Sequence, residues 1–119
     1  MYKVNFYKDK NGRQPVKEYI DDLQKKSQTS KDSRIKLKKI YEYIEILANN
    51  GTRAGEKYTK HIDGEIWELR PLSDRIFFFY WKDDTFILLH SFQKKTQKTP
   101  KKEIEQAKRN LQDFKERSE

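Results

Sequence analysis

The sequence predicts an α+β protein in which helices pack against one small, twisted antiparallel sheet. Apolar residues alternate at period two near the start, and two stretches with helical apolar spacing follow. Three runs rich in aromatic residues then come in succession, separated by short polar breaks, before a last amphipathic stretch. The predicted order is β-α-α-β-β-β-α, and a chain of 119 residues is expected to form a single domain over residues 1–119.

The first half contains a short strand and a helical hairpin. Tyr2, Val4 and Phe6 alternate as in a strand, and the polar segment 9–12 ends it with a turn. Pro15 suits the first turn of a helix, which continues until the break at residues 27–30. A longer helix is predicted from about residue 31 to the segment 49–51, with Thr29 or Ser30 as its N-cap. Both helices present one apolar face, which we expect to cover the sheet.

The second half contains the sheet and a closing helix. Asp63-Gly64 is a strong turn signal. The runs 65–70, 75–81 and 85–93 are dense in Ile, Phe, Tyr and Trp, so we expect an antiparallel meander. Thr99 and Pro100 precede the last predicted helix, whose apolar stripe consists of Ile104, Ala107, Leu111 and Phe114.

Composition excludes several classes of protein. Charged residues make up 39% of the chain and the mean hydropathy is −1.18, but 7 Phe, 7 Tyr and 2 Trp provide enough apolar area for a core. The chain has no Cys and only two His, so we expect no disulfide, no metal site and no cofactor. It contains no glycine-rich phosphate loop, no nucleophile elbow and no dinucleotide fingerprint. No apolar run reaches the ~18 residues of a membrane span, and residues 1–6 do not resemble a signal peptide, so we expect a cytoplasmic protein without membrane contact.

The charge balance indicates a polyanionic partner. The chain has 27 Lys and Arg against 19 Asp and Glu, which gives a net charge of +8 and a pI near 9.5. Such a balance is typical of domains that bind nucleic acid. The alternative is a basic surface that serves solubility alone.

The strand register gathers basic side chains on one face. If residues 71–74 close a simple hairpin, Arg70 and Arg75 lie opposite each other, where like charges repel. The pair then needs either a nearby acid, such as Glu68, or a bound anion, and the arginine fork suits phosphate. The alternative is a pair of surface arginines that form salt bridges with Glu68 and Asp74, while Phe92 lies in the core.

Extending the register through Asp83-Asp84 places Phe92 opposite Arg75 and His90 opposite Phe77. Arg70, Arg75, His90 and Phe92 would then share a face, which Lys94 continues past the strand, unless a β-bulge changes the register. This arrangement predicts a phosphate-binding patch with an aromatic ring for base stacking.

Further basic residues extend this patch. Residues 93–102 contain five lysines and lead into a helix N-terminus, which indicates a positive surface or, alternatively, a solvated loop. We count Lys57, Lys60 and Lys98 with Phe92 as RNA-binding candidates. Of the two imidazoles, His90 could act as an acid or base or be a partly buried strand residue, and His61 is expected to be exposed near the turn.

The segments 63–70, 75–80 and 88–100 closely resemble the RelE/ParE toxin superfamily, and within it the phage-derived, HigB-type branch. The combination of Trp-Glu-Leu-Arg at 67–70, Arg-Ile at 75–76 and Lys-Lys-Thr-Gln-Lys-Thr-Pro at 94–100 is specific, whereas each piece alone is not. The resemblance extends over the helical hairpin and the last helix, and it implies the RelE-like fold. It also implies a bacterial toxin, in many relatives a metal-independent endoribonuclease that cuts messenger RNA at the ribosome.

The resemblance implies roles for particular residues. In metal-free RNA cleavage a ribose 2′-OH attacks the adjacent phosphate, and the charge that develops there must be stabilised. Arg70 and Arg75 match basic residues of the family's active sheet and are expected to stabilise the phosphate. Lys95 or Lys94 would protonate the leaving oxygen or act as a second clamp, with Glu68 or His90 as the base. Relatives often have lysine at the position of Glu68, and a late tyrosine of the family has no equivalent here, so the proton-transfer roles stay open.

Three classes of function follow. The first is this mRNA interferase, neutralised by a HigA-like helix-turn-helix antitoxin. The second is a non-enzymatic, ParE-type toxin that inhibits DNA gyrase by binding. The third is a basic RNA-binding module without activity. Under either toxin hypothesis an acidic antitoxin segment is expected to cover Arg70 and Arg75, and the first two helices are the other docking surface.

Overall fold

A computed structural model describes residues 1–118 and has the predicted α+β class. The elements are β1 (Lys3–Phe6), α1 (Pro15–Lys26), α2 (Lys31–Asn50), the short 3-10 helix η1 (Gly51–Ala54), β2 (Thr59–Asp63), β3 (Ile66–Leu69), β4 (Asp74–Trp81), β5 (Thr85–Gln93) and α3 (Lys101–Arg117). Four strands (β1, β3, β4 and β5), both hairpin helices and the last helix lie where the sequence predicts them. One strand, β2, is additional.

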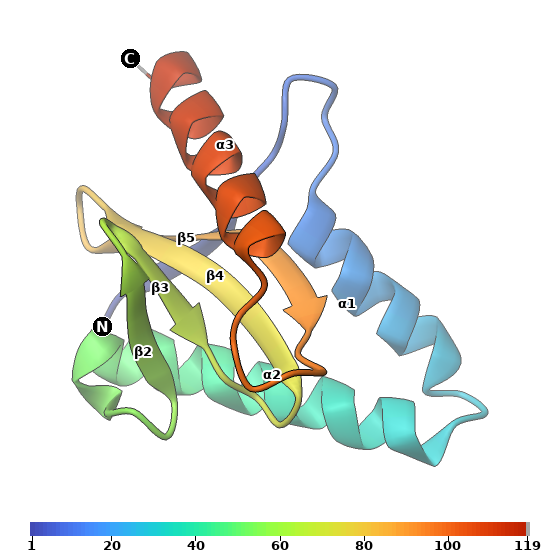
Figure 1. Ribbon diagram of the computed structural model, residues 1–119. Helices are drawn as coiled ribbons and strands as arrows, with labels where there is room; N and C mark the ends of the chain where they lie inside the picture. Colours follow the sequence, from blue (N-terminus) through green and yellow to red (C-terminus); the bar gives the residue numbers. More distant parts are fainter. Residues whose placement is uncertain (119) are drawn as a thin grey trace.

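The five strands form one mixed sheet in the order β1-β5-β4-β3-β2 (Figure 1). The meander β3-β4-β5 is antiparallel as predicted, and β2 pairs with β3 across the Asp63-Gly64 turn. The prediction of a wholly antiparallel sheet is wrong at one edge, because β1 runs parallel to β5. The connection between β1 and the rest of the sheet contains the α1–α2 hairpin, which is long enough for a parallel pairing.

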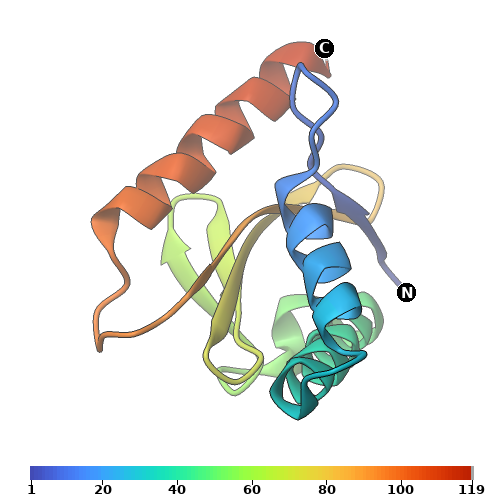
Figure 2. The same ribbon diagram turned by 90° about the vertical axis from the view of Figure 1, so that its right-hand side faces the viewer.

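The sheet lies between two helical layers. Figure 2 shows the α1–α2 hairpin on one face and α3 crossing the other. Against α1 and α2 packs a core that includes Leu69, Ile76, Phe78 and Leu88, each fully buried. The opposite face packs Phe77 and Phe79 against α3. The central strand therefore buries side chains on both faces, which explains its nearly unbroken aromatic run.

Local signals explain the starts of the helices. Pro15 occupies the first turn of α1, where its missing N–H is not needed. The predicted cap of α2 is confirmed at Ser30, whose hydroxyl accepts a hydrogen bond from the Ser33 backbone N–H at 3.2 Å. The N-cap of α3 is Pro100, and no side chain caps this helix.

The predicted register is confirmed at the end of the sheet that carries the arginines. Arg75 pairs with Phe92, and Phe77 pairs with His90. The turn is one residue longer than predicted, because Trp81 pairs with Thr85. A β-bulge between Phe77 and Phe78 then shifts the register back by one residue. The two departures cancel before Arg75.

Within residues 1–118, none of the helices is both long and apolar enough to cross a membrane.

Candidate functional site

A buried charge cluster, consisting of Glu68, Arg70 and Arg75, lies where β3 ends and β4 begins. Arg70 Nε lies 3.3 Å from Glu68 Oε2, and Arg75 Nε lies 3.8 Å from Glu68 Oε1. The Glu68 side chain is only 1% exposed, and the side chains of Arg70 and Arg75 are 25% and 12% exposed. The register Leu69 to Ile76 continues to Arg70 and Arg75, which are therefore neighbours across the two strands as predicted.

The charge cluster is neither neutral nor fully hydrogen-bonded. One carboxylate faces two guanidinium groups, so one positive charge is left uncompensated. Glu68 Oε1, Arg70 Nε and Arg75 Nε are all buried without a hydrogen-bond partner. Buried polar atoms in this condition destabilise a fold by roughly 1–3 kcal/mol each. The cluster is therefore poorly explained as a device for stability.

Both guanidinium groups are anchored on one side. Arg70 Nη1 donates to the Glu56 carbonyl at 2.6 Å. Arg75 Nη1 donates to the carbonyls of Leu72 and Asp74 at 2.6 and 2.8 Å. Among residues 1–118, no hydrogen bond uses Nη2 of either arginine. Each side chain is thus held in place while part of its donor fork stays open to an anion.

Burial lowers the pKa of the Arg75 guanidinium below its usual value. Glu68 opposes this shift by attraction, and the charge of Arg70 adds to it by repulsion. An anion placed against Arg75 would relieve both the desolvation and the repulsion. The electrostatics of the charge cluster therefore favour a negatively charged ligand.

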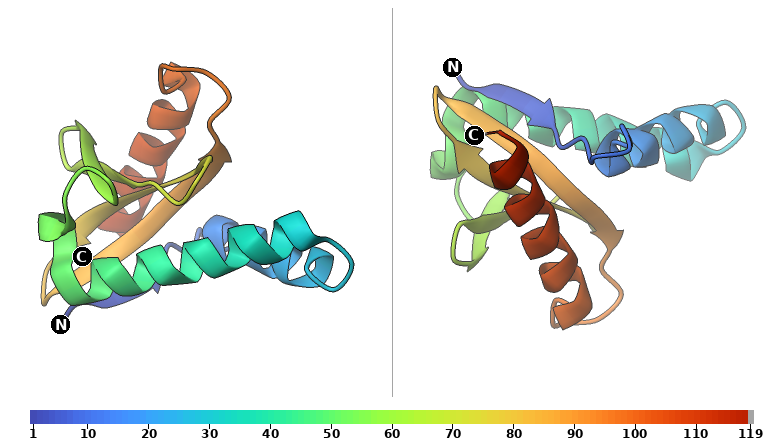
Figure 3. Two further views of the ribbon diagram at one scale, coloured as in Figure 1. Left: turned by 90° about the horizontal axis from the view of Figure 1, so that it is seen from below. Right: turned by 90° about the horizontal axis from the view of Figure 1, so that it is seen from above.

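The loop between β3 and β4 shapes this site. Leu72 has a φ of 55°, in the left-handed region that a leucine rarely occupies. This conformation accompanies a Leu72 carbonyl that accepts from Arg75. The Lys94 backbone N–H donates to the Ser73 carbonyl at 2.8 Å, which joins this loop to the end of β5. Figure 3 shows the β5–α3 connection leaving the sheet beside the same loop.

The alternative prediction, two surface arginines that form salt bridges with Glu68 and Asp74, is correct for the contact with Glu68 and wrong for Asp74. Glu68 does contact both arginines, but they are largely buried. The Asp74 carboxylate lies elsewhere: it accepts from the Tyr19 hydroxyl at 2.6 Å and lies 3.6 Å from Lys36 Nζ. Burial and this carboxylate raise the pKa of the Tyr19 hydroxyl. Adjacent residues of a strand face opposite sides, so Asp74 points toward α1 while Arg75 points away from it.

His90 and Phe92 lie next to Arg75 on the same face of the sheet. Their rings are stacked with centroids 6.2 Å apart, and the ring centroid of Phe92 lies 5.2 Å from that of Phe77. His90 Nε2 lies 2.8 Å from Glu103 Oε1 on α3. Phe92 is only partly buried, so one part of its ring packs in the core and the rest is accessible.

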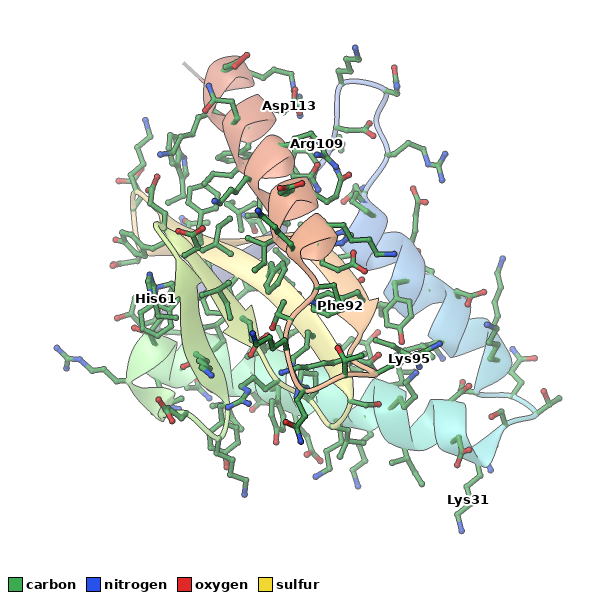
Figure 4. The ribbon with its side chains drawn as sticks, viewed as in Figure 1. Lys31, His61, Phe92, Lys95, Arg109 and Asp113 are labelled. Atoms are coloured by element: carbon green, nitrogen blue, oxygen red, sulfur yellow. The ribbon has the colours of Figure 1, made fainter. Side chains whose placement is uncertain are left out.

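A cleft of about 450 Å³ opens beside Phe92, between α1, the end of β5 and the start of α3. Its lining includes Tyr19, Lys95, Lys102 and Glu103. Lys95 thus reaches the cleft, whereas Lys94 is half-buried and does not line it. Figure 4 shows Phe92 below the start of α3 and Lys95 on the side of α1.

The other predicted residues lie farther out. Lys60 is exposed and pairs in register with Glu68, so it flanks the charge cluster from β2. Lys57 lies before β2 with its Nζ 5.4 Å from the Tyr58 ring, and Lys98 is exposed in the connection to α3. In the part of the chain that the structure describes, neither forms an ion pair with the charge cluster. His61 is exposed and contacts the Gly64 carbonyl at 2.8 Å, as its position near the turn predicts.

Two residues of this region were missed by the sequence reasoning. Glu103 belongs to the first turn of α3, and Tyr19 belongs to α1. A signal for Glu103 exists, because an acid in the first turn after the lysine-rich segment lies near the face on which the register places His90. Tyr19 looked like an ordinary core position. Among residues 1–118, no three His, Asp or Glu side chains gather in a way that could hold a metal ion.

A comparison with protein families found one match. The model of the phage-derived Gp49-like protein family (DUF891) matches residues 18–112. This range includes α2, the strands β2 to β5 and the residues of the charge cluster. A search of curated proteins found no match. The family match supports the broader part of the predicted resemblance, a phage-derived and toxin-like protein.

Proposed function

Because the chain belongs to the Gp49-like family of phage-derived proteins, we propose that it is the toxin of a type II toxin–antitoxin pair and acts as a HigB-type mRNA interferase. The charge cluster is the observation that carries this proposal. It holds two anchored guanidinium groups with one uncompensated positive charge and open Nη2 donors. Those are the properties required to bind a phosphodiester and to stabilise the charge that it gains during cleavage.

The proposed reaction is metal-independent cleavage of RNA. The ribose 2′-oxygen attacks the adjacent phosphorus, the bond from phosphorus to the 5′-oxygen breaks, and a 2′,3′-cyclic phosphate and a 5′-OH end result. Arg70 and Arg75 bind the non-bridging oxygens, whose negative charge increases in the transition state. Their anchoring to the carbonyls of Glu56 and Leu72 means that little reorganisation is needed when the charge develops.

Other residues complete the substrate site. Lys95 lines the cleft beside Phe92 and is the better candidate than Lys94 to protonate the leaving 5′-oxygen. The accessible part of the Phe92 ring offers a surface for base stacking. Lys60, Lys57 and Lys98 extend the positive surface along which the RNA backbone would lie.

The proposal includes a protein partner and a cellular target. A HigA-like helix-turn-helix antitoxin would neutralise the toxin by covering Arg70 and Arg75 with an acidic segment, which competes with phosphate for the same donors. The target would be messenger RNA on the ribosome. A complex in which both arginines stay exposed would contradict direct masking.

The decisive experiment is to map transcript ends in cells after brief induction of the wild type and of Arg75→Ala. We expect new 5′-OH ends and growth arrest with the wild type, and neither with the variant. Arg34→Ala is the matched control, because Arg34 Nη1 also donates to a backbone carbonyl, that of Ser27 at 2.8 Å, but lies on α2 away from the charge cluster. It should keep both effects.

Folding and mechanism can be separated in the same experiment. Thermal unfolding of the purified Arg75→Ala variant tests whether the fold survives. Arg75→Lys keeps the charge but loses the fork, so we expect it to be partly active. Growth arrest with intact transcripts would overturn the proposal, and DNA-damage signalling with intact transcripts would identify a gyrase inhibitor instead.

A further inference from the structure

The pair formed by His90 and Glu103 meets the requirements of an oriented base. Glu103 is an acceptor when ionised, so the 2.8 Å contact requires that His90 Nε2 carries the hydrogen. The Nδ1 atom then has a free lone pair, and no side chain or backbone group in residues 1–118 forms a hydrogen bond with it. The side chains are 17% and 21% exposed, so their orientation is restricted while access is kept.

The other candidate base, Glu68, is poorly suited to proton transfer. Its carboxylate is 1% exposed and lies between two guanidinium groups, which block approach from solvent. Removing its charge would also leave the arginines unpaired. Glu68 is better explained as the group that holds Arg70 and Arg75 in position.

The strand geometry brings His90 toward the phosphate site. Phe92 is directly opposite Arg75, so His90 is the diagonal neighbour of Arg75 on the same face, and such residues lie about 7–8 Å apart. The β-bulge next to His90 changes the direction of the side chains, and the Asn110 amide fixes it by donating to the Leu89 carbonyl at 2.8 Å. His90 therefore lies at the same end and on the same face of the sheet as Arg75.

We propose that Glu103 is a positioning residue for His90, and that His90 Nδ1 is the base of the cleavage reaction; this inference rests on the proposed function. The 2′-OH proton moves to Nδ1 as the bond from the 2′-oxygen to phosphorus forms. The bond from phosphorus to the 5′-oxygen breaks, and the 5′-oxygen takes a proton from the Lys95 ammonium. Glu103 holds the ring in the tautomer that leaves Nδ1 unprotonated and stabilises the imidazolium that results.

Ionisable groups face His90 from two sides. Besides Glu103 on α3, a second cavity of about 420 Å³ faces His90, and its ionisable lining residues are Tyr7, Asp9, Arg13 and Glu18. Arg13 is paired with Glu18 at 2.6 Å, so Glu103 is the only carboxylate that contacts the ring among the described residues.

The test measures single-turnover cleavage of an end-labelled messenger RNA, free and bound to purified ribosomes, from about pH 5 to about pH 9. For the wild type we expect a rate that rises with pH and then levels off. His90→Ala should lower the plateau by about 100-fold and be partly rescued by added imidazole. Glu103→Gln should lower it by about tenfold with little change in KM, because the His90 ring loses the carboxylate that orients it.

Glu105→Gln is the matched control, because it removes the same charge from an exposed position of α3 two residues away. It should leave the rate and the pH profile unchanged. If the wild type cleaves and Arg75→Ala does not, but His90→Ala stays within about threefold of the wild type, the inference is wrong and the proposed function stands. A loss of plateau rate with Glu105→Gln equal to that with Glu103→Gln would also overturn it. If the wild type does not cleave either RNA, the proposed function itself fails.

Discussion

The face of strands β4 and β5 that packs toward α3 has two ends that are both largely buried but differ in chemistry. At one end Phe79, Ile87 and Leu89 are 0–3% exposed and pack against Phe114 of α3. At the other end Arg75 lies against Glu68, and buried polar atoms have no hydrogen-bond partner.

This difference separates stability from function. The apolar end stabilises the fold, because each buried aromatic ring removes a large area from water. The charged end opposes folding, because the attraction between the buried charges only partly offsets the free energy needed to remove them from water. An arrangement that opposes folding persists when a ligand or a reaction needs it, which is why the charge cluster is the better place to look for chemistry.

The largest expected effect on stability is at the apolar end. Phe79→Ala should lower the free energy of unfolding by about 3–5 kcal/mol, because the ring contacts Phe114 and Trp81 and leaves a cavity in the core. Urea unfolding followed by circular dichroism would measure this. Tyr80→Ala is the comparison, because the neighbouring ring is 49% exposed and should contribute much less. Equal losses would show that α3 does not protect this end.

The charged end should respond to the loss of its only acid. Glu68→Gln leaves two desolvated guanidinium groups without a carboxylate, and we expect a loss of about 3 kcal/mol in the free energy of unfolding. Added sulfate should recover part of it by screening and binding. Glu18→Gln removes an acid from the exposed Arg13 pair and should have almost no effect. A Glu68→Gln variant as stable as the wild type would contradict the electrostatic description of the charge cluster.

A smaller, opposite effect is expected in the loop that orients Arg75. Leu72→Gly should raise the free energy of unfolding by about 0.5–1 kcal/mol. Glycine adopts a φ of 55° without the strain of a leucine, and the greater entropy of glycine in the unfolded chain cancels part of that gain. Asp83→Gly, at a φ of 60°, should gain less, since aspartate tolerates this region better. A destabilised Leu72→Gly would mean that the leucine side chain contributes a contact that outweighs its strain.

The smallest effect is confined to alkaline pH. Burial and the hydrogen bond to Asp113 raise the pKa of Tyr7 from 10.0 to about 12. Folding therefore disfavours the ionised phenol, so this contribution is complete below about pH 10 and is lost as the pH rises toward 12. Tyr7→Phe should flatten the fall in stability over this range, as measured by urea unfolding at several pH values. Tyr41→Phe, at a position 50% exposed, should not. Parallel curves for all three proteins would contradict the assignment.

Much of the fold could be predicted because local patterns dominate it. Period-two alternation and helical spacing identified seven of the elements, and turn residues placed their ends. Strand β2 was missed because Lys60 and His61 interrupt any apolar alternation, as is common in an edge strand that has one partner. The parallel pairing of β1 with β5 was missed because no local feature of residues 3–6 specifies which strand lies beside them.

The part of the site that depends on local strand register could also be predicted from the sequence. Simple hairpin counting brought Arg70, Arg75 and Phe92 together, and it succeeded because the longer turn at Lys82–Asp84 and the β-bulge compensate each other. The burial of Glu68, the separation of Asp74 from Arg75 and the contact between His90 and Glu103 depend on how helices pack over the sheet. Those relations are set by tertiary structure, and a single sequence does not report them.

The parallel pairing of the first strand with the last has a consequence for biosynthesis. Lys3–Phe6 is translated before the other four strands but hydrogen-bonds to Thr85–Leu88, so it has no partner in the sheet until β5 has been translated. The pairing of Arg75 with Phe92 is completed at the same late stage. Long-range closure of this kind is slow compared with helix formation. The nascent protein therefore completes its sheet, and with it the arrangement around Arg75, only after β5 has been translated.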